Sequence, residues 1–462
     1  MPLNRRQFLM GVTSASAAGA AAFAKKKAVV RPNIVFVMGN DLGAWMLGCY
    51  GNKEIKTPNI DILARAGMRF ANSFCCTPIS SPSRATLFTG RVPRQHGILD
   101  YLTPNPTANP QQGQDAAPAS FDKEVFISDI LSQQGYNCGF VGKWHMGGDA
   151  QPKHGFQHTY TVPPNTSPYQ SPEISNNGKA IKEEGYVTEL LTRDACSFID
   201  QQKAEKPFFL TVAYPNPHTP YDGHPQKYYD LYAKSIFDTF GFERAAPNAL
   251  NGKEMFADTI GNIRKCAATV TALDDQIPVL LKKLQDRGLR DNTLIVFTGD
   301  NGFLLGRHGL WSKGHASNPI NMYEEVMRVP MIWNWPGKIP AEHVTPDVVS
   351  LYDVMPTICD LTDAEEPTRN LSGRSFLPLV HREQFPKKQP WKQMAFGHFL
   401  NTEMVRDTRF KLVVRDGGAG PGELYDLNAD PREKVNQYEN AQFITIRERL
   451  NKDLAAWRQR TS

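Results

Sequence analysis

Polar side chains follow four short apolar runs of this sequence. The runs cover residues 33–38, 138–141, 208–213 and 294–298, and the polar residues after them are Asn40, Asp41, Lys143, His145, His218, Asp300 and Asn301. Such runs are typical of parallel strands that are buried on both faces. In open α/β sheets, ligands bind beyond the carboxyl ends of the strands. We therefore expect these side chains to meet at one edge of a sheet.

Two of these residues are carboxylates, which predicts a cation between them. Asp41 and Asp300 would repel each other at short range unless a positive ion separated them. Asn40 and Asn301 add amide oxygens, and ligand sets made only of oxygen select a hard ion; Ca²⁺ tolerates irregular geometry better than Mg²⁺. A single Asp at a strand end is more often a turn or helix cap. The predicted Ca²⁺ site therefore depends on the joint placement of these residues.

The segment from Ser80 to Arg91 reads Ser-Ser-Pro-Ser-Arg-Ala-Thr-Leu-Phe-Thr-Gly-Arg. Its hydroxyl groups and its early proline predict the start of a helix. An anion at this terminus would meet unsatisfied backbone N–H groups, the positive end of the helix dipole and Arg84. A helix start explains the Ser-x-Pro sequence but does not require the residues that continue it.

The elements that must position these residues alternate between strand and helix. Helical patterns run from Thr57 to Gly67 and over about 123–134, 187–202 and 263–287, where Pro278 should kink or restart the helix. The alternation predicts an α/β fold with a large mixed, mostly parallel sheet flanked by helices. Residues 101–121 and 149–180 show no periodicity. We interpret both as rims of a substrate cleft, with mere surface insertions as the alternative.

The pattern changes after about residue 375. Short segments at 394–399, 402–405, 410–414 and 423–427 predict antiparallel strands. A closing helix would place Phe443, Ile446, Leu450, Leu454 and Trp457 on one face. We therefore predict one domain over 30–375 and a smaller α+β domain with an antiparallel sheet over 376–462.

The first 24 residues look like an export signal. They carry Arg5-Arg6, then Phe8-Leu9, a stretch of small residues and a final Ala22-Phe23-Ala24, similar to a twin-arginine signal peptide. The alternative is a basic, disordered tail. The signal predicts transport by the twin-arginine export machinery to a periplasmic or extracellular location. No segment has the roughly 20 strongly apolar residues of a membrane span, so no stable membrane anchor is expected.

Composition and charge exclude several classes of protein. Of the 462 residues, 40% are hydrophobic and 21% are charged, which argues against a disordered chain. The net charge of +5 is not gathered into a stripe of Lys and Arg, so no nucleic-acid partner is expected, whereas a small anionic substrate is compatible with it. The 7 cysteines lack Cys-x-x-Cys spacing, which argues against a disulfide framework or a zinc site.

The segment that begins at Ser80 resembles the signature of the sulfatases, members of the alkaline phosphatase superfamily. The family motif is Cys/Ser-x-Pro-Ser-Arg followed by Thr-Gly-Arg, and Ser80 at the first position is similar to the serine-type form. Further similar segments are 32–51, 142–145, 217–221, 298–302, 311–313 and 423–430. The resemblance implies that residues 30–375 form a catalytic sulfatase domain and that a dedicated maturase oxidises Ser80 to formylglycine.

The resemblance also implies an activity and a role for each site residue. The activity is hydrolysis of a sulfate monoester, such as a sulfated carbohydrate, with release of inorganic sulfate. Ser80, as formylglycine, would be the nucleophile, since one hydroxyl of a hydrated aldehyde attacks sulfur and the other later drives release. The implied Ca²⁺ ligands are Asn40, Asp41, Ser80, Asp300 and Asn301.

The implied proton-transfer and sulfate-binding residues surround that nucleophile. Arg84 and Lys143 would hold the aldehyde hydrate and the charges of the metal site, and Lys313 would contact sulfate oxygens. His218, together with Lys313, would protonate the leaving group, and His145 would be the base that triggers collapse of the adduct. Further residues that could line the cleft, but that salt bridges explain about as well, are Arg91, Arg94, His96, Arg307 and His308.

One residue departs from the family pattern, and two other functions stay open. The family usually shows Asp-Asp where this chain has Asn40-Asp41, so one negative charge is lost and we expect a retained but weaker Ca²⁺ site. A phosphodiester or phosphonate ester hydrolase of the same superfamily could share the aldehyde nucleophile. A non-catalytic binder of sulfated glycans would leave Ser80 unmodified.

Overall fold

The computed structural model describes residues 31–103, 114, 117–118, 120–148, 152–163, 169–367 and 370–462. Pro32–Ser462 form one compact unit. The predicted export signal, residues 1–24, lies outside the described residues, as do 104–113, 149–151 and 164–168 of the predicted cleft rims. No helix in the described part of the chain is long and apolar enough to cross a membrane.

The larger sheet of the described residues has ten strands in the order β10-β2-β9-β8-β1-β7-β3-β4-β5-β6. They are β1 (Asn33–Gly39), β2 (Met68–Phe74), β3 (Asn137–Lys143), β4 (His158–Val162), β5 (Glu173–Asn176), β6 (Lys179–Lys182), β7 (Phe208–Ala213), β8 (Thr293–Gly299), β9 (Met331–Asn334) and β10 (His343–Ser350). Strands β8, β1, β7, β3 and β4 pair in parallel, whereas β9, β5 and β6 pair antiparallel. The predicted mixed sheet is confirmed, and its four apolar runs are β1, β3, β7 and β8.

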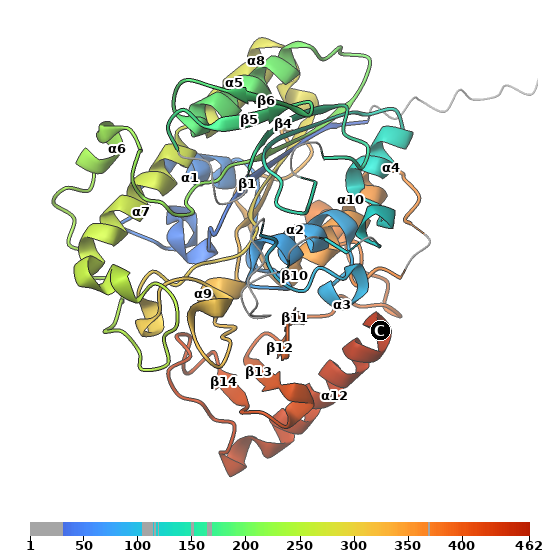
Figure 1. Ribbon diagram of the computed structural model, residues 1–462. Coiled ribbons are helices and arrows are strands. Elements are labelled where there is room, and N and C mark those ends of the chain that lie inside the picture. The colour runs from blue at the N-terminus through green and yellow to red at the C-terminus, as the bar shows by residue number, and fades with distance from the viewer. Residues whose placement is uncertain are drawn as a thin grey trace, which may run out of the picture. The chain divides into compact units, whose positions relative to one another are not determined.

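The helices are α1 (Pro58–Arg65), α2 (Ser80–Thr89), α3 (Pro93–His96), α4 (Ile127–Gln133), α5 (Val187–Asp200), α6 (Gln226–Asp230), α7 (Thr259–Asp274), α8 (Ile277–Asp286), α9 (Glu324–Met327), α10 (Val354–Thr362), α11 (Leu377–His381) and α12 (Ile444–Thr461). They cover both faces of the sheet (Figure 1) because successive strand residues point to opposite sides. In β1, Ile34 and Phe36 join a core with α2, α4 and α10. Val35 and Val37 join a second core with α1, α5, α7 and α8. Pro278 lies in the first turn of α8, so it restarts the helix.

The last part of the chain forms a separate antiparallel sheet in the order β11-β12-β13-β14. Its strands are β11 (Ala395–Phe399), β12 (Thr402–Arg406), β13 (Phe410–Arg415) and β14 (Glu423–Asp426). As predicted, Leu450, Leu454 and Trp457 of α12 are buried in the core of this sheet. That core also takes in Cys76 and Val92 of the first part. The C-terminal α+β fold is confirmed, while the boundary at residues 375 and 376 stays a prediction.

The prediction that residues 149–180 lack regular structure is wrong for part of this stretch. Strand β4 pairs in parallel with β3, and β5 and β6 form an antiparallel hairpin beside it. The hairpin turns at Asn177 and Gly178, which both have positive φ. An Asn-Gly pair is the strongest short-range signal of a hairpin, so the sequence did carry evidence for these strands.

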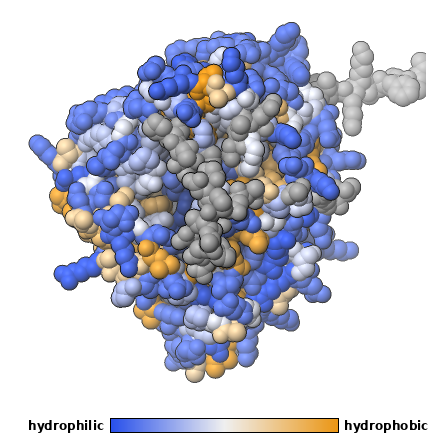
Figure 2. Space-filling model, viewed as in Figure 1, coloured by the Kyte–Doolittle hydropathy of each residue, from blue (hydrophilic) through white to orange (hydrophobic). Residues whose placement is uncertain are grey.

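The described surface and the cysteines agree with the composition. Figure 2 shows that the described surface on this side of the molecule is mostly hydrophilic, with small, separate hydrophobic patches.

All the cysteines have free thiols and most are buried, as the spacing predicts. Burial raises the pKa of the Cys76 thiol to about 12, so it stays protonated and unreactive.

Two glycines with positive φ test the close packing of β3 on β7. An added Cβ at Gly142 (φ +116°) would lie 2.0 Å from the Ala213 oxygen, whereas at Gly135 (φ +90°) it would meet nothing within 4 Å. Gly135→Ala should lower the free energy of unfolding by about 1 kcal/mol through backbone strain. Gly142→Ala should lower it by about 3–5 kcal/mol, because the clash adds to the strain. Urea denaturation measures both, and equal losses would contradict the packing.

Candidate active site

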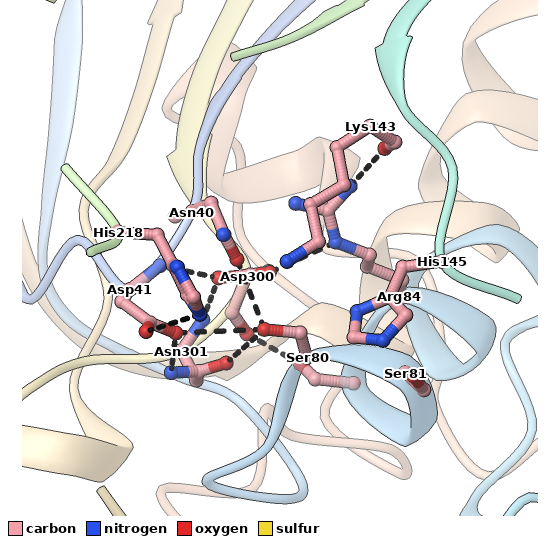
Figure 3. Close-up of polar contacts among 12 residues, drawn as sticks. Asn40, Asp41, Ser80, Ser81, Arg84, Lys143, His145, His218, Asp300 and Asn301 are labelled. Atoms are coloured by element: carbon pink, nitrogen blue, oxygen red, sulfur yellow. Dashed lines mark hydrogen bonds and ion pairs between the residues drawn. The ribbon is translucent and has the colours of Figure 1, made fainter. Parts of the chain in front are cut away.

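Ser80 is the first residue of α2, and its side chain points toward the ends of β1 and β8 (Figure 3). The side chain is buried. The residues before it are fixed by the C-terminal sheet. The His398 N–H donates to the Cys76 oxygen at 2.8 Å, and the Thr77 hydroxyl donates to the His398 oxygen at 2.8 Å. The helix start predicted from the sequence thus places a hydroxyl in the interior at the sheet edge.

Side-chain oxygens from two strand ends surround the Ser80 hydroxyl. Its Oγ lies 3.0 Å from Asn40 Oδ1, 3.4 Å from Asp41 Oδ1 and 3.1 Å from Asn301 Oδ1. The parallel register of β1 and β8, which ends with Gly39 opposite Gly299, brings the next residues of both strands out side by side. The backbone N–H groups of Asp41 and Asn301 donate to Asp300 Oδ1 at 2.9 and 2.8 Å. The structure therefore brings the predicted oxygen ligands together.

Arg84 is the buried partner of Asp300. Its Nε donates to Asp300 Oδ2 at 2.8 Å, and neither side chain is exposed. Its second nitrogen, Nη1, donates to the Lys143 backbone oxygen. The third, Nη2, is buried without a hydrogen-bond partner among the described residues. Because a buried N–H without an acceptor is costly, this nitrogen indicates that one more oxygen belongs in the pocket.

Two lysines place positive charge beside the oxygens. The Lys313 ammonium donates to Asp41 Oδ1 and lies 3.3 Å from Ser80 Oγ. The Lys143 Nζ lies 3.0 Å from the Asn40 carboxamide. Burial, followed by the charges of Arg84 and Lys313, lowers the pKa of Lys143 to about 7. Burial would raise the pKa of Asp41, but Lys313 and His218 outweigh it and lower that pKa to about 2.

Two histidines lie near these charges. His218 Nε2 lies 3.8 Å from Asp41 Oδ2. Burial, followed by the charge of Lys143, lowers the pKa of His218 to about 4. His145 Nε2 lies 2.8 Å from the Leu102 oxygen, and the same two causes hold the pKa of His145 well below its usual range. Both imidazoles are therefore neutral at pH 7.

The backbone at two of these residues is in the left-handed region. Asp41 has φ +64° and His145 has φ +59°. Residues other than glycine rarely adopt this conformation, which costs on the order of 1 kcal/mol or more. Surrounding structure must hold them there, and such strain is concentrated at functional sites.

The oxygens of this pocket fit a hard divalent ion. In one orientation of its carboxamide, Asn40 brings its oxygen 3.0 Å from Ser80 Oγ and 2.9 Å from Asp300 Oδ2. In the other orientation the amide nitrogen donates over both distances, so the carboxylates of Asp41 and Asp300 are the charged ligands that such an ion would have. Within the described ranges no group of three or more His, Cys, Asp and Glu side chains could hold a metal. The amide oxygens of Asn40 and Asn301 are therefore needed to complete a ligand set here.

A pocket of about 430 Å³ opens beside the cluster. Asn40, Lys143 and His218 form its polar side, and Val162 and Tyr169 are among its apolar residues. The Tyr169 hydroxyl donates to the His218 oxygen at 2.8 Å. Neither apolar residue was predicted, because both lie in the stretch that shows no periodicity. The run of β-branched and aromatic residues over 159–162 was the available signal.

The structure gives Arg94 and His308 partners outside this cluster. Arg94 pairs with Glu403 and lies over the ring of Trp457, 4.7 Å from its centroid. The ring of His308 stacks on Tyr323 with centroids 3.8 Å apart, and its Nε2 lies 3.2 Å from Glu325 Oε2. Arg91 pairs with Glu124, His96 is buried beside Thr86, and Arg307 lies over Trp45. These contacts match the alternative of salt bridges and packing, and a substrate role for Arg94 and His308 stays a prediction.

Comparison with known proteins decides the family. The model of the family described as Sulfatase matches residues 32–364, and a model of the N-sulphoglucosamine sulphohydrolase C-terminal region matches residues 306–460. This chain belongs to the sulfatase family. The sulfatase chain is 27% identical to N-acetylglucosamine-6-O-sulfatase of Bacteroides thetaiotaomicron, over 92% of this chain and 86% of that protein. It is 30% identical to N-acetylgalactosamine-6-sulfatase of Canis lupus familiaris, over 80% of this chain and 69% of that protein.

Solved structures give the same result for this sulfatase. BT4656 in complex with its substrate D-glucosamine-2-N,6-O-disulfate matches with a TM-score of 0.78 and 26% identity, over 93% of this chain and 98% of that chain. The phosphonate monoester hydrolase of Agrobacterium radiobacter matches with a TM-score of 0.74 and 21% identity, over 94% and 96%; this likeness shows the fold alone. The predicted family is confirmed, as is the predicted class of enzyme, a sulfuric ester hydrolase.

Removal of the Arg84 guanidinium tests how far Asp300 depends on it. Arg84→Met leaves a buried carboxylate without its partner, which should lower the free energy of unfolding by about 3–5 kcal/mol. Arg193→Met is the matched control, because Arg193 pairs with Glu183 at 3.0 Å but is 59% exposed. That loss should be at most about 1 kcal/mol. Chemical denaturation compares the two, and an equally small loss for both would contradict the buried ion pair.

Proposed function

We propose that this sulfatase hydrolyses a sulfate monoester of a sulfated saccharide and releases inorganic sulfate. The observation that carries the proposal is the environment of Ser80. A buried hydroxyl there meets the oxygens of Asp41 and Asn301 and the ammonium of Lys313. A structural serine needs only one or two hydrogen-bond partners. A nucleophile that attacks an anion needs positive charge and ion-binding oxygens around it.

In this proposal, the two lysines bind the sulfate group. Lys143 and Lys313 contact the cluster from different elements, and charge-assisted hydrogen bonds from ammonium groups suit anionic oxygens. A bound anion would stabilise the charged form of Lys143, whose pKa of about 7 leaves it only partly protonated at neutral pH. The start of α2 adds the positive end of a helix dipole.

The histidines are proposed to move the protons. His218 faces the pocket and is the proposed acid for the leaving group, with Lys313 as its helper. Its neutral state at pH 7 fits this role only once an anion binds, since a nearby negative charge raises the pKa of an imidazole. His145 is already neutral, and a neutral imidazole can accept a proton. It is therefore the proposed base for the release step.

Two further groups complete the proposed site. Formylglycine, made from Ser80 by a maturase, supplies a hydrated aldehyde with one hydroxyl for attack on sulfur and one for release. Ca²⁺, held by Asn40, Asp41, Asp300, Asn301 and the side chain at position 80, supplies positive charge for the sulfate oxygens and the nucleophile. Support comes from the Arg84 Nη2 without an acceptor, which fits an added oxygen, and from the Asp41 and Asn301 oxygens that lie close to Ser80 Oγ.

The proposed substrate is a sulfated sugar of the glycosaminoglycan type. Two similar proteins are named for 6-sulfated amino sugars, and BT4656 is described with a disulfated glucosamine. The pocket beside Ser80 combines polar residues with Val162 and Tyr169, which suits the polar edges and apolar faces of a sugar ring. Rates with a panel of sulfated monosaccharides, measured in parallel with phosphate and phosphonate esters, separate this proposal from the related hydrolase activity.

We also propose that the protein is exported by the twin-arginine route and acts in the periplasm or outside the cell. The support is the sequence pattern around Arg5-Arg6 and the final Ala22-Phe23-Ala24. Since folded proteins use this route, oxidation of Ser80 would precede export.

Replacement of Ser80 tests the nucleophile. In protein produced with a maturase, Ser80→Ala should lower kcat for a sulfate ester by about 10⁴-fold or more. The neighbour Ser81 is the control: its Oγ accepts the Leu102 N–H at 2.9 Å. Ser81→Ala should keep activity within about tenfold of wild type, since one neutral hydrogen bond is lost. Full activity of Ser80→Ala would contradict the proposal, and glycan binding by an inactive wild type would favour the non-catalytic binder.

Metal removal tests the proposed ion. Dialysis against EGTA should lower sulfatase activity by at least about tenfold, because the charge that neutralises the sulfate oxygens is lost. Added Ca²⁺ should restore it, and Mg²⁺ should restore less because it demands a more regular octahedral geometry. Protein that elemental analysis shows to be free of metal, yet fully active, would contradict the metal site.

A further inference from the structure

We propose that the Asn40 carboxamide has two working orientations. Its nitrogen faces Ser80 and Asp300 when the pocket holds no divalent ion, and its oxygen faces the ion when one is bound. The inference rests on the proposed function for the presence of an ion. It goes beyond that function by giving Asn40 a role that an aspartate at the same position could not perform.

The orientation without an ion is set by three hydrogen bonds. With the nitrogen turned inward, Asn40 donates to Ser80 Oγ at 3.0 Å and to Asp300 Oδ2 at 2.9 Å. Its oxygen then accepts from the Lys143 Nζ at 3.0 Å. With the oxygen turned inward and no ion present, the Ser80 hydroxyl could still donate to it, but the 2.9 Å contact with Asp300 Oδ2 would join two acceptors. Asn40 is also fully buried, so water cannot easily take over these contacts.

The orientation with an ion follows from the chemistry of the ligands. Only oxygen binds a hard divalent ion, so the amide must present Oδ1 to it. A rotation of half a turn about the last side-chain bond exchanges the two atoms and moves nothing else in the residue. The ion then takes over the interaction with Asp300 that the amide nitrogen provided before.

Lys143 is affected by the same rotation. In the inward-oxygen orientation, Nδ2 of Asn40 faces the Lys143 Nζ, and two donors cannot bond each other. Ion binding therefore removes one acceptor from Lys143 and favours a shift of its ammonium toward other acceptors, such as the oxygens of a sulfate group. Asn40 acts in this way as a positioning residue that links occupancy of the ion site to the place of Lys143.

An aspartate at position 40 would behave differently in both states. It has two acceptor oxygens and no donor, so one oxygen could face the ion while the other kept Lys143. Without an ion, its inner oxygen would lie against Asp300 and repel it. The asparagine thus stabilises the empty pocket, and the ion must displace its hydrogen bonds in order to bind.

Two crystal structures of the wild-type protein test the rotation directly. One is grown in EGTA and one in Ca²⁺, both at about 1.0 Å resolution, where amide oxygen and nitrogen can be told apart from density and hydrogens. We expect nitrogen toward Asp300 in EGTA, oxygen toward the ion in Ca²⁺, and a displaced Lys143 Nζ in the second. The same orientation in both crystals would overturn the proposal.

Calcium titration of variants gives a second readout that needs no activity. By calorimetry, Asn40→Asp should bind Ca²⁺ at least about tenfold more tightly than wild type. The added ligand charge strengthens binding, and no amide hydrogen bonds have to be broken first. The melting temperature of this variant should also rise more on addition of Ca²⁺. Asn248→Asp adds the same charge at an exposed residue and should match wild type. Unchanged or weaker binding by Asn40→Asp would overturn the proposal.

The results of these measurements are independent of whether the proposed activity is correct. Affinity, melting and amide orientation are recorded without a substrate and without formylglycine. A protein that binds Ca²⁺ as expected but leaves sulfate esters intact would refute the proposed activity and retain the inference. A sulfatase whose Asn40 keeps one orientation would do the reverse.

Discussion

The charges of Asp41 and Asp300, buried within one pocket, impose the constraint that most of the site satisfies. Each carboxylate would be costly in the interior without compensation. Asp300 is held by Arg84 and by two backbone N–H groups, and Asp41 by the Lys313 ammonium. The oxygens that remain face Ser80 and one another. The compensation is therefore arranged around the side chain at position 80.

Both sheets hold the residues of this site in position. The register of β1 and β8 fixes where Asp41 and Asp300 leave the larger sheet. The smaller sheet fixes the position of Ser80, because the backbone of His398 in β11 forms hydrogen bonds with Cys76 and Thr77. Buried ion pairs also connect the smaller sheet to α9. Lys411 of β13 lies 2.7 Å from Glu433 and 3.4 Å from Glu324 of α9. The C-terminal part thus contributes to the position of Ser80, the proposed nucleophile, although its described residues supply no side chain to the oxygen cluster.

Much of this could be predicted from the sequence, and the remainder has physical reasons. Strands β1, β3, β7 and β8 are continuous apolar runs, so their type and their shared edge followed from periodicity. Strands β4 to β6 were missed because each is short, and β5 and β6 are also only partly buried, although Asn177-Gly178 marked their hairpin. The partners of Arg94 and His308 could not be predicted. Arg94 meets Glu403, and His308 meets Tyr323, only through tertiary packing, which no local sequence pattern describes. The two orientations of Asn40 depend on distances of a few tenths of an ångström, which no sequence pattern contains.

The central claim is that the side chain at position 80 carries an oxidised carbon beside the oxygen cluster. Tandem mass spectrometry of the tryptic peptide from Phe70 to Arg84, taken from protein of the native host, measures it most directly. The account predicts the loss of two hydrogens, located at residue 80 and not at Ser73, Ser81 or Ser83. An intact serine at position 80 throughout that sample would contradict it.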